Sequence, residues 1–183
     1  MSKKAIPTNT VTCTDGSTDT YIGINPNTNT DDKVQAFVDC FKSAASIASS
    51  ICYNLPVKLI LAQWGGECGW ATGSTQKSNQ NFSNLGYNSA TNPVGNIGQG
   101  KNGWAKFEGR GKHTQGYAYW FINNSRYSSL ITYLEYCKRT YASPDASVCA
   151  STIANAGFGG SDHDAYYQNL VSWMNTLTNH ATL

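Results

Sequence analysis

The chain has 183 residues, enough for one domain with its own hydrophobic core. Asp, Glu, Lys and Arg make up only 13% of it, and the formal net charge is +2. The few basic residues are scattered, which excludes the basic surface of a nucleic-acid-binding protein. No apolar run is long enough to span a membrane.

The N-terminal segment differs in composition from the rest. Residues 1–30 are rich in Thr, Asn, Gly and Pro and show no helical period. We therefore predict a polar arm over residues 1–30 and one folded domain over residues 31–183. The start Met1-Ser2-Lys3-Lys4 lacks the apolar core of a signal peptide, so no cleavable signal is expected in this chain.

Two helices are predicted in the first part of the domain. Asp31 and Asp32 place negative charge at the start of the first helix, and Pro56 suits the first turn of the second. The second helix, from about residue 57 to residue 67, is apolar nearly all round, which is typical of a buried central helix. The apolar face of the first helix comprises Val34, Phe37, Val38, Phe41, Ala45, Ala48 and Ile51.

The segment that follows is of another kind. Residues 72–112 are crowded with Gly, Asn, Ser, Thr and Gln, which indicates loops and short strands. A long segment without a helix inside a compact domain is usually functional. We expect it to form one wall of a cleft, with a small hairpin, and we expect His113 beside it to be exposed.

Helices resume after this segment. The apolar pattern predicts one helix from Gln115 to Asn123, a second capped by Ser125, a third starting at residues 143–145, and a final helix after the turn at residues 157–162. The predicted fold is therefore mainly α, with an irregular glycine-rich lobe inserted after the central helix.

Six cysteines in a polar chain of low charge predict disulfide bonds and an oxidising compartment, outside the cell or in the periplasm. No C-x-x-C pair is present and no histidine is spaced with a cysteine as a ligand set, so we expect no metal. Spacing alone suggests the pairs Cys40–Cys52, Cys137–Cys149 and Cys13–Cys68.

A carboxylate ends the predicted central helix. Glu67 lies between glycines, with Trp64 before it and Trp70 after it. Poor solvation there disfavours the charged form and raises the pKa, as a general acid working near neutral pH requires. Tryptophans beside a carboxylate also indicate a sugar site, because indole faces stack on pyranose rings. The alternative is a carboxylate that is merely capped or salt-bridged at a helix end.

Four segments occur in an order that carries a family resemblance. They are Leu55–Trp70, with the sequence LPVKLILAQWGGECGW; residues 81–87, NFSNLGY; residues 107–127, with GYAYWFINNSRY; and residues 156–162, AGFGGSD, followed by Tyr166. Over residues 33–178 they resemble the glucosaminidase family of bacterial peptidoglycan hydrolases. Cys68 stands where that family usually has Ser, and Phe158 stands where it usually has Tyr, so a hydroxyl contact from that position is absent.

The resemblance implies a lysozyme-like α+β fold, in which a helical core and an irregular loop or short β-hairpin lobe form a cleft. It also implies that Glu67 is the catalytic acid. Further substrate contacts are expected from Phe158 and Tyr166 at motif positions, and Tyr166 is equally explained by helix packing.

Other contacts with substrate are suggested by residue type. Trp70, Tyr87 and Trp104 are candidates for lining sugar subsites, with packing as the alternative. Gln63 and Asn84 are candidates for binding an acetamido group, with structural hydrogen bonds as the alternative.

Elimination suggests a second carboxylate. Glu108 is the only acidic residue between Glu67 and Glu135, and the other acids lie in the arm, the first helix or helix starts. Glu108 is therefore the candidate base, and the alternative is a solvated turn residue paired with Lys106 or Arg110. Two mechanisms without this base stay open: attack by the substrate's own N-acetyl group, and lytic transglycosylation by one glutamate.

These observations predict a monomeric enzyme without a cofactor that hydrolyses β-1,4 bonds in the glycan strands of peptidoglycan, as an N-acetylglucosaminidase by resemblance. The alternatives are a muramidase or lytic transglycosylase with the same acid, and a non-catalytic wall-binding module. The six cysteines and the absence of a signal peptide are also consistent with a secreted antibacterial effector. Such an effector would be inhibited by a cognate immunity protein.

Overall fold

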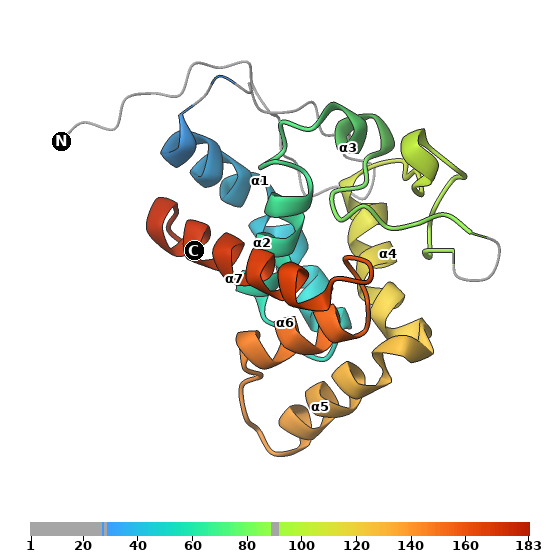
Figure 1. The fold of residues 1–183 in the computed structure, drawn as a ribbon, viewed down its shortest axis with the longest axis vertical. Helices are drawn as coiled ribbons and strands as arrows, with labels where there is room; N and C mark the ends of the chain where they lie inside the picture. The colour runs from blue at the N-terminus through green and yellow to red at the C-terminus, as the bar shows by residue number, and fades with distance from the viewer. Residues whose placement is uncertain (1–26, 28, 89–91) are drawn as a thin grey trace.

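The computed structural model describes residues 27, 29–88 and 92–183. Within these residues the chain is mainly helical, and two isolated bridges are its only β-structure. The prediction of a mainly α, lysozyme-like fold is confirmed. The predicted arm lies almost wholly outside the described residues. The elements are α1 (Thr30–Ile51), α2 (Val57–Glu67), α3 (Ser74–Asn79), η1 (Lys101–Gly103), α4 (Arg110–Asn123), η2 (Ser125–Tyr127), α5 (Ser128–Arg139), α6 (Ala146–Asn155) and α7 (His163–His180) (Figure 1).

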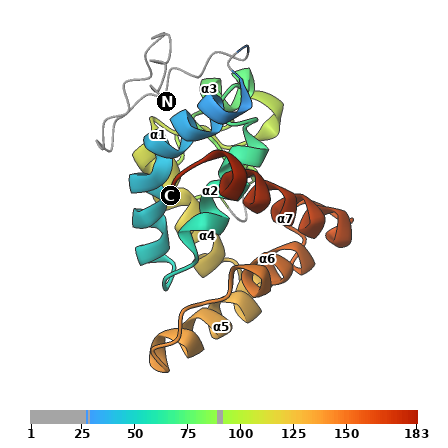
Figure 2. The same ribbon diagram turned by 90° about the vertical axis from the view of Figure 1, so that its left-hand side faces the viewer.

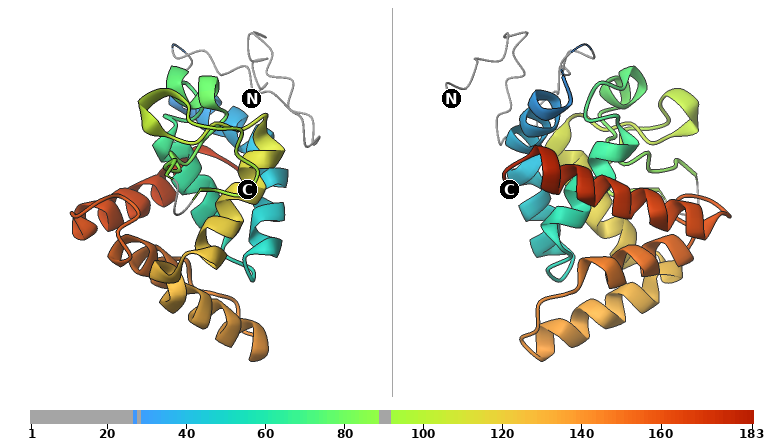
Figure 3. Two further views of the ribbon diagram at one scale, coloured as in Figure 1. Left: turned by 90° about the vertical axis from the view of Figure 1, so that its right-hand side faces the viewer. Right: turned by 60° about the vertical axis from the view of Figure 1, so that its left-hand side comes forward.

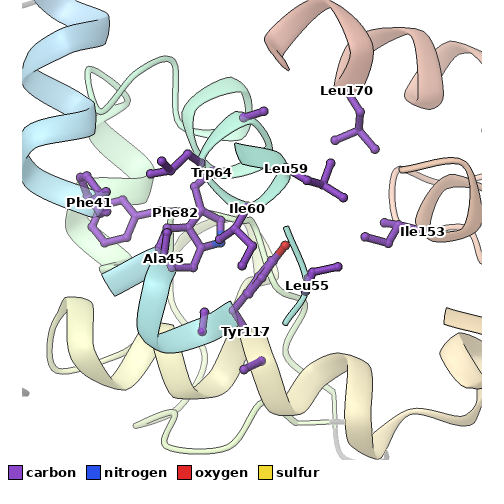
Figure 4. Packing of buried hydrophobic residues seen from close by; sticks show 14 of the residues in the cluster. Phe41, Ala45, Leu55, Leu59, Ile60, Trp64, Phe82, Tyr117, Ile153 and Leu170 are labelled. Atoms are coloured by element: carbon purple, nitrogen blue, oxygen red, sulfur yellow. The ribbon is translucent and has the colours of Figure 1, made fainter. Parts of the chain in front are cut away.

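Helix α2 is the central helix, as the sequence predicts. It packs against α1, α6 and α7, and Leu59, Ile60, Leu61 and Trp64 have no exposed surface. Figure 4 shows the side chains of Leu59, Ile60 and Trp64 among those of α1, α4 and α7 in one core. Because this core surrounds α2, the end of the helix at Glu67 is held in place from several sides.

The remaining helices extend from this core. Helix α4 packs on α1, and α5 and α6 lead back to α7, which crosses α2 (Figures 2 and 3). Asp145 and Asp162 cap α6 and α7 by accepting hydrogen bonds from backbone N–H groups. Ser125 does not cap a long helix. Instead Asn124 caps η2, and α5 begins at Ser128. None of the described helices combines the length and apolar character that crossing a bilayer requires.

The lobe after α2 contains more helix than predicted. The short helix α3 and the turn η1 lie within it, and α4 begins at Arg110 rather than Gln115. Instead of a regular hairpin, isolated antiparallel bridges join Gly86 to Trp104 and Gln99 to Ala105. Composition missed α3 because a six-residue helix of polar residues has no apolar period and is held by tertiary contacts.

Side-chain amides hold this lobe together. The Asn81 side chain donates to Leu85 O and Ala105 O and accepts from Leu85 N–H. Asn79 donates to Lys101 O and accepts from Lys101 N–H. These buried amides satisfy backbone groups that a strand ladder would otherwise pair, so an irregular segment keeps a fixed shape.

The expectation of an exposed His113 is wrong. The ring is fully buried beside Trp64, Phe82 and Phe107, with centroids 4.9, 5.2 and 5.5 Å away. Its Nε2 lies 2.8 Å from Ser83 Oγ. Burial lowers the pKa of His113 to about 3, because the charged ring has no compensating anion there. The position on α4 rather than in a loop turns this side chain inward.

The three suggested cysteine pairs are wrong. Cys52, Cys68, Cys137 and Cys149 carry free thiols, and all four are buried. Cys40 is disulfide-bonded, and its partner is not among the described residues. Cys13 lies outside the described residues. Spacing along the chain failed because cysteines on separate helices are placed by helix packing rather than by the lengths of the loops between them.

Candidate active site

Glu67 is the last residue of α2 and is half-buried. The chain then turns sharply, because Gly69, Trp70 and Ala71 all have left-handed backbones, with φ of 59°, 54° and 65°. Such conformations are unfavourable for Trp and Ala, and they persist where the surroundings impose them. The Cys68 sulfur accepts a hydrogen bond from Ala71 N–H at 3.1 Å, so a free thiol, and not a disulfide, supports this turn.

Each oxygen of the Glu67 carboxylate receives a hydrogen bond. Tyr166 donates from its hydroxyl to Oε1 at 2.7 Å, and Asn84 donates from Nδ2 to Oε2 at 2.6 Å. Burial raises the pKa of Glu67 above its ordinary value, and these two hydrogen bonds oppose the rise because they favour the charged form. The predicted elevation of the pKa therefore has a structural cause.

A chain of hydrogen bonds leads from the core to Oε1. The Tyr117 hydroxyl donates to Gln63 Oε1 at 2.5 Å, and Gln63 Nε2 donates to the Tyr166 oxygen at 2.8 Å. Tyr117 and Gln63 have no exposed surface, and Tyr166 is buried. Gln63 was a candidate for binding an acetamido group. Its amide is fully buried here, and its hydrogen bonds go to Tyr117 and Tyr166.

A second, shorter chain leads to Oε2. Gln76, on α3, donates from Nε2 to Asn84 Oδ1 at 2.9 Å and to the Glu67 carbonyl oxygen at 3.2 Å. Asn84 has φ of 52°, a left-handed conformation that Asn adopts more readily than most residues. The donor bond from Gln76 leaves the amide nitrogen of Asn84 facing Glu67, so the irregular lobe contributes directly to the site.

Glycines let large rings approach the end of α2. A Cβ on Gly66 would lie 2.0 Å from the ring of Trp173, and one on Gly65 would lie 2.2 Å from the ring of Trp70. Trp173 belongs to α7, and its ring centroid is 6.1 Å from that of Tyr166. Two half-buried indoles therefore lie directly against the helix backbone next to Glu67.

The other predicted aromatic contacts are spread around the site. The Phe158 ring stacks on Tyr166, with centroids 5.8 Å apart, at the position where the family that the sequence resembles usually has Tyr. Trp70 packs edge-on against Phe37 of α1, at 5.5 Å. Tyr87 and Trp104 are half-buried in the lobe, and Tyr87 packs against the hydrophobic core. Trp104 is bridged to Gly86, so both aromatics belong to the lobe that carries Asn84.

Glu108 lies outside this network. It occupies a bend just before α4, and its side chain is exposed. It forms no ion pair with Lys106 or Arg110 in the described part of the chain, and the Arg110 guanidinium is buried and donates to Cys40 O. The carboxylate is thus free of the pairing that would explain it as a structural residue.

Sequence reasoning missed Gln76, Tyr117 and Trp173. Gln76 could not be identified from the sequence, because it lies among many other Asn and Gln residues in a polar segment without a period. Tyr117 and Trp173 fall within helices that the sequence predicts, but only packing brings them to Glu67. A signal for Tyr117 did exist: Gln63 lies within an apolar helix and needs a buried hydrogen-bond partner.

The arrangement at Glu67 suits proton transfer. No group of three or more His, Cys, Asp or Glu side chains in residues 29–88 and 92–183 is placed to hold a metal ion. A half-buried carboxyl with a raised pKa, held by two donors, can instead carry a proton and release it to a group on its open side.

The chain matches the model of a known protein family. The family model described as "Glucosaminidase: Mannosyl-glycoprotein endo-beta-N-acetylglucosaminidase" matches residues 43–179, which includes α2, the lobe and α4 to most of α7. No curated protein and no solved structure matches the chain.

Proposed function

Because this chain belongs to the glucosaminidase family and is a glycoside hydrolase, we propose that it hydrolyses the β-1,4-linked glycan of peptidoglycan. The resemblance noted from sequence is confirmed at the level of the family. The family description names an N-acetylglucosaminidase, which supports cleavage after N-acetylglucosamine rather than after N-acetylmuramic acid. The polar surface and slight positive charge suit an anionic wall polymer.

In this proposal Glu67 is the general acid. Its proton passes to the glycosidic oxygen as the bond from that oxygen to the anomeric carbon breaks. The observation that carries the assignment is the pair of donors on its two oxygens: Tyr166 and Asn84 both donate, so neither accepts the acid's proton. The proton is left to the open side of the carboxyl, where a substrate oxygen can take it.

The second half of the reaction needs an attacking group. We assign Glu108 as the base that takes a proton from water while the water oxygen bonds to the anomeric carbon. Its carboxylate is exposed and forms no ion pair with any residue that the structure describes, which supports this role. Attack by the substrate's N-acetyl group, or formation of an anhydro product by Glu67 alone, are the competing outcomes.

The test of the acid is a matched pair of variants. Wild type should release reducing ends from purified cell walls and lower their turbidity, whereas Glu67→Gln should bind walls without lysing them. Glu135→Gln, which removes an exposed carboxylate on α5, should act like wild type. Equal lysis by wild type and Glu67→Gln would contradict the assignment, and binding without release by wild type would indicate a wall-binding module.

A second experiment identifies the bond and the base. Mass spectrometry of the fragments shows which sugar carries the new reducing end, and an anhydro end identifies a transglycosylase. If Glu108 is the base, Glu108→Gln loses hydrolysis, and a small anion such as azide restores turnover by attacking in place of water. Full activity in Glu108→Gln assigns the attack to the substrate's N-acetyl group or to transglycosylation.

We further propose that the protein acts outside the cytoplasm, as an antibacterial effector that an immunity protein blocks. The disulfide at Cys40 supports an oxidising location. Expression in a bacterium with and without a periplasmic signal tests this: lysis should require the signal and an intact Glu67. Lysis by the protein kept in the cytoplasm would overturn the proposal for location.

A further inference from the structure

The orientation of one buried amide decides what Glu67 meets at Oε1. Gln63 presents its nitrogen to the Tyr166 oxygen, at 2.8 Å, so that oxygen accepts a hydrogen bond there. The hydroxyl proton of Tyr166 is then directed to Glu67 Oε1, at 2.7 Å. If the amide turned over, its oxygen would take the Tyr166 proton, and a lone pair of Tyr166 would face Glu67.

The Tyr117 hydroxyl fixes which way the amide points. Tyr117 has no exposed surface, and Gln63 Oε1 is the only hydrogen-bond partner of its hydroxyl among the described residues. With the amide turned over, the hydroxyl would accept from nitrogen and its own proton would be buried without an acceptor. The need to place that proton therefore selects one orientation of Gln63.

We propose that Tyr117 is a positioning residue for Glu67, and that its hydroxyl sets, through Gln63, the direction of the Tyr166 hydrogen bond and so keeps the proton of Glu67 for the substrate. The inference rests on the function proposed above. Tyr117 cannot touch the substrate, because Gln63 and Tyr166 lie between its hydroxyl and the carboxylate. The effect travels only through hydrogen-bond polarity.

The main variant is Tyr117→Phe, which removes the hydroxyl and keeps the ring. The Gln63 amide is then free to turn over, and the protonated Glu67 carboxyl can donate a hydrogen bond to the Tyr166 oxygen, which directs its proton away from the substrate. We expect kcat to fall by about tenfold, since only part of the general-acid contribution is lost, with KM unchanged. The basic limb of the pH profile of kcat should move to higher pH, because the Glu67 carboxylate loses a donor.

The matched control is Tyr127→Phe. Tyr127 is also fully buried, but its hydroxyl accepts from Trp120 Nε1 at 3.4 Å and lies outside the chain that ends at Glu67. Both variants lose one buried hydroxyl, so both lower the melting temperature. Only Tyr117→Phe should move the pH profile, which separates positioning from general stabilisation of the core.

A second variant tests the route. Gln63→Met removes the amide at similar size. The Tyr166 oxygen then loses the N–H that polarises it, but no amide oxygen competes for its proton, so the pH profile should move in the same direction and less far than in Tyr117→Phe. Adding Tyr117→Phe to Gln63→Met should change the profile no further, because Tyr117 acts only through Gln63. Gln63→Met also serves if Tyr117→Phe does not fold. Independent, additive shifts from the two substitutions would overturn the route.

A readout without substrate keeps this inference separate from the proposed function. Carbon NMR of the Glu67 carboxyl should show a higher pKa in Tyr117→Phe than in wild type or Tyr127→Phe. If that pKa moves but no glycan is cleaved, the positioning holds and the proposed function fails. If glycan is cleaved and neither the pKa nor the pH profile moves, the positioning inference is wrong.

Discussion

The hydroxyl of Tyr166 donates a hydrogen bond of 2.7 Å to Oε1 of Glu67, although 99 positions separate the two residues in the chain. Tyr166 is in the first half of α7 and Glu67 is at the end of α2. The crossing of these two helices therefore creates the site. The properties of Glu67 depend on how α7 packs as well as on its own sequence surroundings.

Removal of the Tyr166 hydroxyl should change the pKa of Glu67. In Tyr166→Phe the carboxylate loses a donor that lowers its pKa, so the pKa of Glu67 should rise further and the basic limb of the kcat profile should move to higher pH. Gln63 Nε2 also loses its acceptor, which should cost about 1–3 kcal/mol of stability. Tyr167→Phe, which removes a hydroxyl without a described partner from the same helix, should leave both quantities unchanged. The measurements are pH-rate profiles and urea denaturation.

Glu67 should also affect stability as a function of pH. Burial raises its pKa in the folded state above the ordinary value of 4.5. Below pH 4.5 the carboxyl is protonated in both states. As pH rises from 4.5 through the folded pKa, the unfolded chain releases the proton first, so the free energy of unfolding falls. Glu67→Gln lacks this titration, so the stability of wild type relative to Glu67→Gln should fall as pH rises from 4.5 through the folded pKa. Urea denaturation at several pH values checks this, and an equal difference at every pH would contradict it.

His113 should make the free energy of unfolding rise with pH, the opposite of the effect of Glu67. Its folded pKa of about 3 lies below the ordinary 6.5, so the unfolded chain binds a proton that the folded ring refuses. Stability is fully present above pH 6.5 and should fall toward pH 3 by about 1.4 kcal/mol per pH unit. In His113→Gln this part of the slope should vanish, even though the variant is less stable at pH 7. A slope unchanged from wild type would show that the ring is charged, and therefore solvated, in the folded state.

The close contact with the Trp173 ring should allow only glycine at position 66. Alanine is the better helix former, so Gly66→Ala would stabilise an open helix by about 1 kcal/mol. Here the added Cβ would lie 2.0 Å from the indole, so Gly66→Ala should destabilise the protein and displace the ring. In a Trp173→Ala background the same substitution should become neutral or stabilising. The coupling is measured by denaturation of all four proteins, and additive effects would show that the two residues do not touch.

The helical core and Glu67 followed from sequence because their signals are local. An apolar run that ends in a carboxylate between glycines marks α2, its burial and its unusual last residue, whatever the rest of the chain does. The lobe was predicted less well. Its shape depends on buried amides such as Asn79 and Asn81 bonded to backbone more than 20 positions away, and no periodicity marks such contacts.

The sequence by itself therefore determined the family and the central helix, and it singled out Glu67 as the candidate acid. Only the tertiary structure decided which groups surround that acid. Tyr117, Gln76 and Tyr166 lie on three different helices, and the donor or acceptor that each presents depends on what it meets. A carboxylate's burial can be inferred from neighbours along the chain, but hydrogen-bond polarity at its oxygens is set by residues that packing brings together.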